Sequence, residues 1–307
     1  MLILSHGDAD GVCSVAVFYK AKQNSKIPVI FTSPAALKDT LCRSMIKRAL
    51  DELYIFDLAG TRETVRIASA WKKVVWIDHH SWEPEDKFEN MEIIIKPYPS
   101  ATQVVAEYFG IKDGIIEIAN EIDTNSIKSS EAEFLRNLIG AIKWKFNGKK
   151  ELNSKLREIS KEIAFKGIEE MQTNENYAKL IQEFNEFIEN SLNEVVQKIK
   201  IESINGMKIA IYESTKFLPV YAITEKLSEH EEAPFDIIAV ICYRVSEKGV
   251  STKIELRTQT GVNVKKIAEM LNGGGHKVAA GATVQELYTG TKIIELIKNL
   301  QEEYSIT

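Results

Sequence analysis

The fold of this chain is decided at its start, where residues 1–20 read MLILSHGDADGVCSVAVFYK. The apolar run at residues 2–4 predicts a short strand, and Val12, Val15 and Tyr19 repeat at helical spacing after it. A polar loop with two aspartates lies between the strand and the helix. This order is typical of a βα unit in a parallel sheet, whose ligand-binding loops gather at the carboxyl edge.

The same alternation of strand and helix continues through the first third of the chain. Ser100-Ala-Thr-Gln103 resembles a capping box and predicts a helix from Ala101 to Phe109. We therefore expect an α/β fold whose N-terminal domain is built on a parallel sheet. Four further apolar runs predict its other strands, at Val29–Thr32, Tyr54–Phe56, Val74–Ile77 and Glu92–Ile95.

The remainder of the chain changes character twice. Residues 131–201 are almost wholly helical in pattern and contain no proline. Beyond them, residues 207–212 and 235–243 predict buried strands. Residues 250–256 alternate apolar with polar side chains, which predicts a half-buried strand with Arg257 on its polar face. We predict three segments: a parallel-sheet domain at 1–130, a helical remainder and connector at 131–203, and a smaller mixed α/β domain at 204–307.

The composition excludes several classes of protein. With 44% hydrophobic and 27% charged residues, the 307-residue chain is globular rather than disordered. A net charge of -5 argues against a broad basic surface that coats duplex DNA. The three cysteines form no CxxC pair, which disfavours a thiolate zinc site and a disulfide framework. Since no segment resembles a signal peptide or a membrane span, we expect a cytoplasmic protein without a membrane partner.

Acidic side chains follow several of the predicted elements. Each one alone is explained at least as well by a turn or a helix N-cap. Together, five carboxylates at one edge of a sheet would repel one another strongly unless cations neutralised them. They are Asp8 and Asp10 in the first loop, Asp57 after the third strand, Asp78 after the fourth with His79 and His80 next to it, and Asp123 at the end of a predicted helix.

Metal binding is the simplest remedy for this repulsion. Carboxylates and imidazoles without thiolates suit Mn²⁺, Mg²⁺ or Co²⁺ better than a structural zinc ion. A shared carboxylate is needed to hold two cations about 3.5 to 4 Å apart, the separation that serves phosphate hydrolysis. The residues therefore predict a centre for two divalent cations.

These motifs resemble those of a known family, the DHH phosphoesterase superfamily with its RecJ-like and nanoRNase-like branches. The C-terminal motifs are similar to the DHH-associated C-terminal domain, and the resemblance covers residues 1–125 and 205–285. It implies a catalytic DHH domain followed by a substrate-binding domain. The motifs that carry it are His6-x-Asp8-x-Asp10-Gly11, Asp57, Asp78-His79-His80, Asp123-Thr124, Leu256-Arg257 and the run from Gly273 to Gly281.

The resemblance implies a role for each residue of the first domain. Asp57 would bridge two metal ions and act in catalysis with His80, which would face the substrate phosphate, and with Asp78, which would orient a neighbouring histidine. Some branches place the first histidine four residues before the equivalent of Asp8, but His6 stands only two before it, which leaves its role open. The implied metal ligands besides Asp57 are Asp8 and His6 for one ion and Asp10, His79 and Asp123 for the other.

The predicted substrate-binding residues of the second domain are Arg257 and the run Gly273-Gly274-Gly275-His276, which follows a predicted helix at 262–271. Glycines let backbone N–H groups approach a phosphate closely, and the two basic side chains can grip a phosphate or stack on a base. The alternative is a glycine-rich turn after a helix, with the histidine satisfied by ordinary hydrogen bonds.

A lysine-rich run at residues 143–150 interleaves Trp144 and Phe146 with four lysines. Such a run can bind single-stranded nucleic acid by stacking and charge. The interpretation that we favour is a solvated helix end whose aromatic side chains lie in the core.

The resemblance implies a metal-dependent, exonuclease-like phosphodiesterase with two Mn²⁺ ions, in whose place Mg²⁺ or Co²⁺ would also fit. Its substrates would be short oligonucleotides, single-stranded nucleic acid ends, cyclic dinucleotides or a nucleotide 3′-phosphate. The alternative is a non-catalytic replication- or repair-associated scaffold on the same fold, which retention of every ligand class disfavours. The choice of DNA or RNA, the cleavage polarity, a homodimer and a replication or repair partner all stay open.

Overall fold

Two compact units make up the chain, Met1–Phe184 and Asn185–Thr307. Helix α9 (Glu175–Lys198) begins in the first unit and ends in the second. Each unit has its own sheet and its own apolar core. The computed structural model describes residues 1–47, 51–146, 148–216, 218–246 and 249–303.

The first unit is built on a five-stranded sheet, parallel throughout, in the order β2-β1-β3-β4-β5. All five predicted strands are present, so the α/β class with a parallel sheet is confirmed. Strand β2 lies on one side of β1, and the chain then crosses to the other side of β1 to form β3. The carboxyl ends of β1 and β3 are therefore the switch point where ligands of such sheets bind. The strands are β1 (Leu2–His6), β2 (Val29–Thr32), β3 (Glu52–Phe56), β4 (Lys73–Asp78) and β5 (Met91–Ile95).

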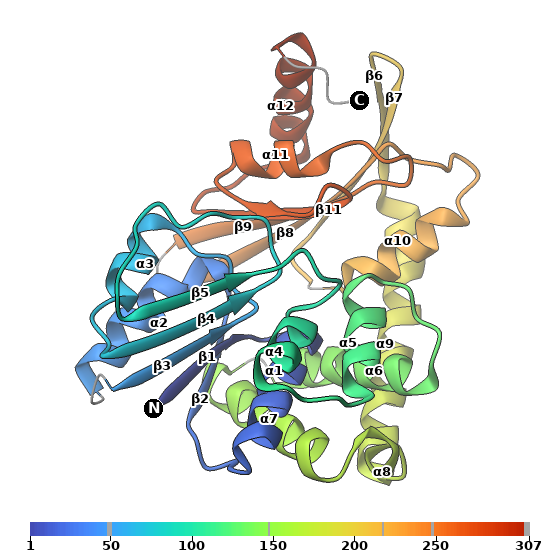
Figure 1. Cartoon of the computed structure of the whole chain (residues 1–307). Coiled ribbons are helices and arrows are strands. Elements are labelled where there is room, and N and C mark those ends of the chain that lie inside the picture. Colours follow the sequence, from blue (N-terminus) through green and yellow to red (C-terminus); the bar gives the residue numbers. More distant parts are fainter. Residues whose placement is uncertain (48–50, 147, 217, 247–248, 304–307) are drawn as a thin grey trace. The chain divides into compact units, whose positions relative to one another are not determined.

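Helices cover both faces of this sheet (Figure 1). Leu4 and Trp76 pack on one face with α2 and α3, while Ile3 and Phe56 pack on the other with α1. Because both faces are buried, the strands are near-continuous apolar runs rather than alternating ones. The helices of the unit besides α9 are α1 (Ala9–Lys22), α2 (Pro34–Lys47), α3 (Arg62–Ala68), α4 (Ala101–Phe109), α5 (Ile115–Asp123), α6 (Ser130–Lys145), α7 (Lys149–Phe165) and α8 (Ile168–Gln172).

The helical pattern predicted for residues 131–201 corresponds to α6, α7, α8 and α9. Much of it packs within the first unit, because Leu138 and Ile142 of α6 and Leu156 of α7 lie in the same core as Phe18 of α1. The predicted helix from Ala101 to Phe109 is α4, with Ser100 as its N-cap. Among the described residues, no helix has the length and apolar character needed to cross a membrane.

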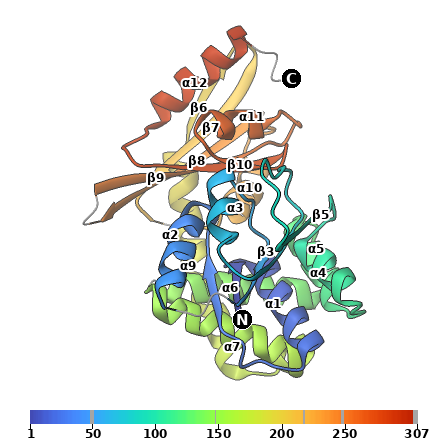
Figure 2. The same ribbon diagram turned by 60° about the vertical axis from the view of Figure 1, so that its left-hand side comes forward.

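The second unit has a mixed six-stranded sheet in the order β10-β11-β9-β8-β7-β6, in which only β7 and β8 pair in parallel. Helices α11 and α12 pack on one face, against Ile241, Ile254 and Leu256 (Figure 2). The mixed C-terminal domain is therefore confirmed. Its elements are β6 (Lys200–Ile204), β7 (Met207–Ser214), α10 (Val220–Ser228), β8 (Ile237–Ser246), β9 (Gly249–Arg257), α11 (Val264–Met270), β10 (Gly274–Gly275), β11 (Ala279–Val284) and α12 (Gly290–Glu303).

Strand β9 shows the alternation expected of it, with one exception. Thr252, Ile254 and Leu256 are buried, but Val250 at the start of the strand is 36% exposed. Strands β6, β10 and β11 have no counterpart in the sequence-based prediction. Strand β11 reads AAGATV, which contains only two β-branched residues, so its pairing with β9 rather than its own composition makes it a strand.

Candidate metal centre

Asp8 lies at the junction of β1 and α1 and serves two purposes. It is the N-cap of α1, where its Oδ1 accepts a hydrogen bond from the Gly11 N–H at 3.0 Å. Its Oδ2 lies 2.6 Å from Nδ1 of His6. A Cβ at position 11 would lie 2.2 Å from the His6 carbonyl oxygen, so only glycine lets the helix start this close to the strand. The N-cap explanation of Asp8 is therefore correct for one carboxylate oxygen and leaves the other facing the cluster.

Asp10 is buried in the first turn of α1 and is held by the start of α4. Its Oδ2 accepts the N–H of Ala101 at 2.7 Å, and its Oδ1 accepts the N–H of Thr102 at 2.8 Å and the Thr102 hydroxyl at 2.6 Å. A helix N-terminus stabilises an anion through free N–H groups and its dipole. The fold thus stabilises a buried carboxylate with groups that lie more than 90 positions along the chain.

Asp57 follows β3 and has a positive φ of 55°, which is uncommon for a residue other than glycine. Strained backbone of this kind concentrates at functional sites. Its Oδ2 lies 3.6 Å from Nδ1 of His6, and its Oδ1 lies 3.7 Å from Nε2 of His79. Within the described part of the chain, Oδ2 is buried and accepts no hydrogen bond. The two oxygens of one carboxylate therefore face two different histidines.

His79 is oriented by a backbone carbonyl. Its Nδ1 lies 3.0 Å from the Tyr98 carbonyl oxygen, and because a carbonyl only accepts, Nδ1 must be the donor. The lone pair of the neutral ring is then on Nε2, which lies 3.8 Å from Asp10 Oδ2 and 3.4 Å from Asp123 Oδ2. Metal-binding histidines typically have their second nitrogen fixed in this way.

Three groups of potential ligand atoms result among the described residues of the first unit, each with its atoms within 4.8 Å of one another, and two of them consist of the predicted metal ligands. Burial raises the pKa of Asp57 well above its ordinary value, and the charges of Asp8, Asp10 and Asp123 raise it further. The pKa of Asp123 is also raised well above the ordinary range, by burial and by Asp10 and Asp8. Carboxylates that resist ionisation together, around a buried oxygen that accepts no hydrogen bond among the described residues, fit divalent cations. The two groups of predicted ligands are His6, Asp8 and Asp57, and Asp10, His79 and Asp123.

Asp78 and His80 form a pair beside these groups. Asp78 Oδ1 accepts from the His79 N–H at 2.9 Å and lies 2.8 Å from His80 Nδ1, while Oδ2 accepts from the Trp82 indole at 2.6 Å. Burial lowers the pKa of His80, but the hydrogen bond and charge of Asp78 outweigh it and raise this pKa to about 9. With both oxygens engaged, Asp78 holds a cationic His80, whose Nδ1 lies 3.8 Å from Asp57 Oδ1.

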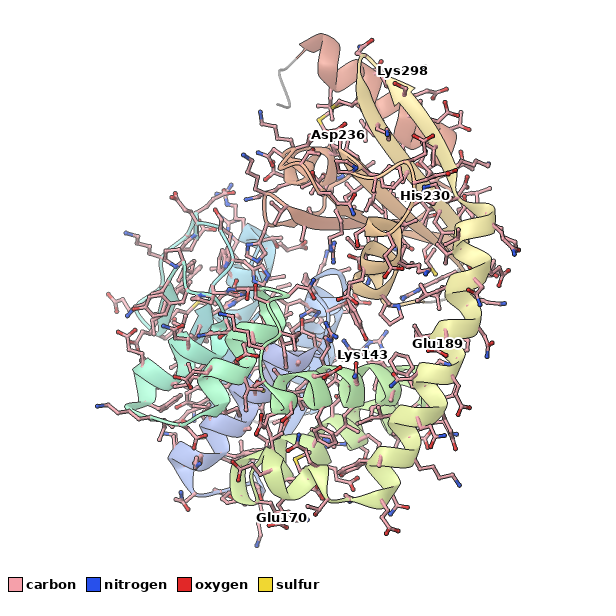
Figure 3. The ribbon with its side chains drawn as sticks, turned by 90° about the vertical axis from the view of Figure 1, so that its right-hand side faces the viewer. Lys143, Glu170, Glu189, His230, Asp236 and Lys298 are labelled. Carbon is pink, nitrogen blue, oxygen red and sulfur yellow. The ribbon has the colours of Figure 1, made fainter. Side chains whose placement is uncertain are left out.

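The aromatic side chains of the lysine-rich run and its lysines have different surroundings. Phe146 packs against the core of the first unit, Trp144 lies 6.0 Å from the ring of Phe184, and Lys145 pairs with Glu183 at 2.8 Å. Lys143, labelled in Figure 3, is half-buried in the last turn of α6. The favoured interpretation of the run as a helix end with aromatics in the core agrees with these contacts; its Asn147 lies outside the described residues.

Lys143 also acts on the acidic cluster, through the pKa of Asp8, which the sequence did not indicate. Burial by itself would raise the pKa of Asp8, but the charge and hydrogen bond of His6 and the charge of Lys143 hold this pKa well below its ordinary value. Asp8 is therefore an ionised carboxylate in the cluster. The carbonyl of Tyr98 and the amides of Ala101 and Thr102 were likewise not foreseen, since backbone groups leave no signature in a sequence.

The predicted substrate-binding residues lie together in the second unit. Arg257 ends β9 and is paired with Ala279 of β11, and the glycines form the hairpin β10-β11. A Cβ at Gly273 would lie 2.2 Å from the Gly281 carbonyl oxygen, and Gly275 has a φ of 133°. Two of the glycines are thus required by the hairpin itself, whereas a Cβ at Gly274 would have no neighbour within 4 Å among the described residues. A role of these residues and His276 in substrate binding stays a prediction.

Two family profiles match the chain, one within each of its two units. The profile of the DHH family, N-terminal domain, matches residues 1–136, and that of the DHHA1 domain matches residues 209–305. No curated protein sequence matches the chain.

Solved structures share the fold at low sequence identity. The pGpG-specific phosphodiesterase PggH from Vibrio cholerae is 13% identical, with a TM-score of 0.55 over 98% of both chains. Exonuclease RecJ bound to manganese is 13% identical, with a TM-score of 0.54 over 99% of this chain and 90% of that one. RecJ from Thermus thermophilus in complex with Mn²⁺ is also 13% identical, with a TM-score of 0.60 over 99% of this chain and 52% of that one.

Proposed function

Because this chain belongs to the DHH superfamily, with a DHHA1 domain after its DHH domain, we propose that it is a two-metal-dependent phosphodiesterase. Its proposed substrates are short oligonucleotides, single-stranded nucleic acid ends or small nucleotides. The observation that carries the proposal is the placement of Asp57, whose two carboxylate oxygens lie 3.6 and 3.7 Å from histidines of two separate ligand groups. One carboxylate between two sets of donors is the arrangement that a pair of cations requires.

In this proposal, Asp57 would hold both cations, and the two groups on either side of it would supply the remaining donors. Two divalent cations so held would supply an activated water and neutralise charge on a phosphoryl group. Manganese is the first ion to test, because it is the ion bound to RecJ, which shares this fold. The remaining donors are His6 and Asp8 for one ion, and Asp10, His79 and Asp123 for the other.

The residues of the chain itself bind and orient the substrate. The ring of His80 lies beside Asp57 and is held by Asp78, so it is placed to face a phosphoryl oxygen on which negative charge develops. Lys143 adds a positive charge near Asp8. Arg257, with the glycine hairpin and His276, would be the group of the second unit that binds a phosphate or a base of the substrate.

The test combines metal binding with hydrolysis. Calorimetry with Mn²⁺ should show two ions per chain, and a panel of a labelled dinucleotide, a short single-stranded oligonucleotide, a cyclic dinucleotide and a nucleotide 3′-phosphate should include a substrate that is hydrolysed. Asp57→Asn should abolish hydrolysis while the fold is retained, since asparagine also tolerates a positive φ. Asp51→Asn is the matched control, because the described contact of the Asp51 side chain is a surface ion pair with Lys72.

Two outcomes would overturn the proposal. Hydrolysis that persists in Asp57→Asn would remove the bridging carboxylate from the mechanism. Two bound manganese ions with no hydrolysis of any member of the panel would instead favour the non-catalytic replication- or repair-associated scaffold.

A further inference from the structure

Three charged side chains share one face of β9. Lys253, Glu255 and Arg257 alternate with the buried Ile254 and Leu256, so they point to the face opposite the core of the second unit. Successive side chains on one face of a strand are about 6.8 Å apart, close enough for each charge to act on the next. The carboxylate therefore stands between two cations.

The two cations hold this carboxylate unequally. Glu255 Oε1 makes a short ion pair with Lys253 Nζ, whereas Oε2 lies 3.4 Å from Arg257 Nη1. The same Nη1 donates to the Leu256 carbonyl at 2.9 Å. Within the described residues, every hydrogen bond and ion pair of the Arg257 side chain is made through Nη1. Glu255 therefore makes no hydrogen bond or ion pair with the Nε and Nη2 atoms of Arg257 in the described structure.

Glu255 is an ionised group with room to move. Burial would raise its pKa, but the charges and hydrogen bonds of Lys253 and Arg257 lower it. Its partner across the sheet is Gly281, where an added Cβ would lie 3.4 Å from Oε2. A small cavity bordered by Glu255, Lys253, Ser214 and other residues of the unit adjoins the carboxylate. The pairing with Lys253 holds Oε1 of Glu255 away from Arg257.

We propose that Lys253 is a positioning residue that holds Glu255 aside, so that the Arg257 guanidinium stays available for a phosphate group of a nucleotide ligand. This role rests on the proposed function, in which Arg257 binds substrate. An arginine binds carboxylate and phosphate with the same planar fork, so Glu255 and the ligand compete for it. Loss of the lysine charge lets Glu255 turn fully onto Arg257, where it both occupies the fork and repels the phosphate.

The experiment measures binding of a fluorescently labelled 5′-phosphorylated dinucleotide, pApA, to the full chain in EDTA, where no divalent cation is present to support hydrolysis. Lys253→Met should weaken binding by about tenfold, the equivalent of one charged hydrogen bond. Glu255→Gln should bind at least as tightly as the parent. The Lys253→Met, Glu255→Gln double variant should return to within about twofold of Glu255→Gln, because the competing carboxylate is gone. Lys253→Arg should retain binding.

Controls separate this role from the others. Lys292→Met removes a surface lysine that pairs with Glu286 in the same unit and should leave binding unchanged. If the double variant binds as weakly as Lys253→Met, Lys253 contacts the ligand itself and the positioning role is wrong, while the role of Arg257 in the proposed function stands. If the parent binds no pApA, or Arg257→Met binds it normally, the proposed role of Arg257 fails and the positioning role fails with it.

Discussion

Substitution of Gly11 by alanine tests the structural basis of the metal centre most directly. The new Cβ would lie 2.2 Å from the His6 carbonyl oxygen, against an ordinary contact distance of at least 3.4 Å. The neighbour is the backbone of β1, which pairs with β2 on one side and β3 on the other, so it cannot give way cheaply. Helix α1 must therefore move away from the strand by about 1 Å, taking Asp8 and Asp10 with it.

The cost can be estimated from known effects of overpacking. Added methyl groups in packed cores cost about 1–3 kcal/mol, and a clash with backbone in a central strand belongs at the upper end, about 3 kcal/mol. Urea unfolding in EDTA, followed by tryptophan fluorescence, reports this cost for the first unit alone, because all four tryptophans lie there. With a slope of about 2 kcal/mol/M, the midpoint should fall by about 1.5 M.

Gly114→Ala provides the matched control. A Cβ at this N-cap of α5 would have no neighbour within 4 Å among the described residues. The entropy lost from the unfolded chain opposes the poorer N-cap, so the net change should stay within about 0.5 kcal/mol. An unchanged midpoint for Gly11→Ala would refute the close approach of α1 to β1 from which the position of both acids is argued.

Three further predictions concern the centre itself. Thr102→Val removes the hydroxyl that donates to Asp10 at 2.6 Å and should weaken Mn²⁺ binding by about tenfold in calorimetry, whereas Thr102→Ser should bind normally. Asp78→Asn should lower the pKa of His80 from about 9 toward its ordinary value near 6.5. At pH 8 the ring should then be protonated in the wild type and neutral in the variant. An NMR titration of the metal-free proteins that finds equal pKa values for His80 would contradict this. Mn²⁺ at a hundred times its dissociation constant should raise the free energy of unfolding of the first unit by about 2.7 kcal/mol for each ion bound, and Asp57→Asn should lose most of this gain when the urea assay is run without EDTA.

The parallel sheet could be predicted from the sequence because its strands are buried on both faces. A strand of this kind is a short apolar run, and an acid at its end or within two residues of it must lie at the carboxyl edge, which located Asp8, Asp57 and Asp78. Asp123 followed from the helical spacing of the residues before it, and α5 does end there. These acids therefore lie close together because of the order of the strands in the sheet, as well as because of their own positions in the sequence.

What the sequence could not show are the groups that hold the acids in place. Asp10 is stabilised by amides at the start of α4, and His79 by the carbonyl of Tyr98, contacts that only the folded chain creates. The pattern Ser100-Ala-Thr-Gln103 announced a helix start, but not that its free amides face a buried carboxylate. The sequence also left open whether His6 belongs to the cluster, because that depends on distances in the folded chain. Its Nδ1 lies 2.6 Å from Asp8 and 3.6 Å from Asp57.

The donors of the proposed centre are drawn from positions between His6 and Asp123, on five different elements or the loops after them. No short peptide from this chain contains both ligand groups, so a growing polypeptide on the ribosome has the full set only after α5 has emerged. The free energy of closing so long a loop must come from packing of the sheet and helices, before any ion can contribute. Capture of metal would therefore be a late event in biosynthesis, and would mark a first unit that has already folded.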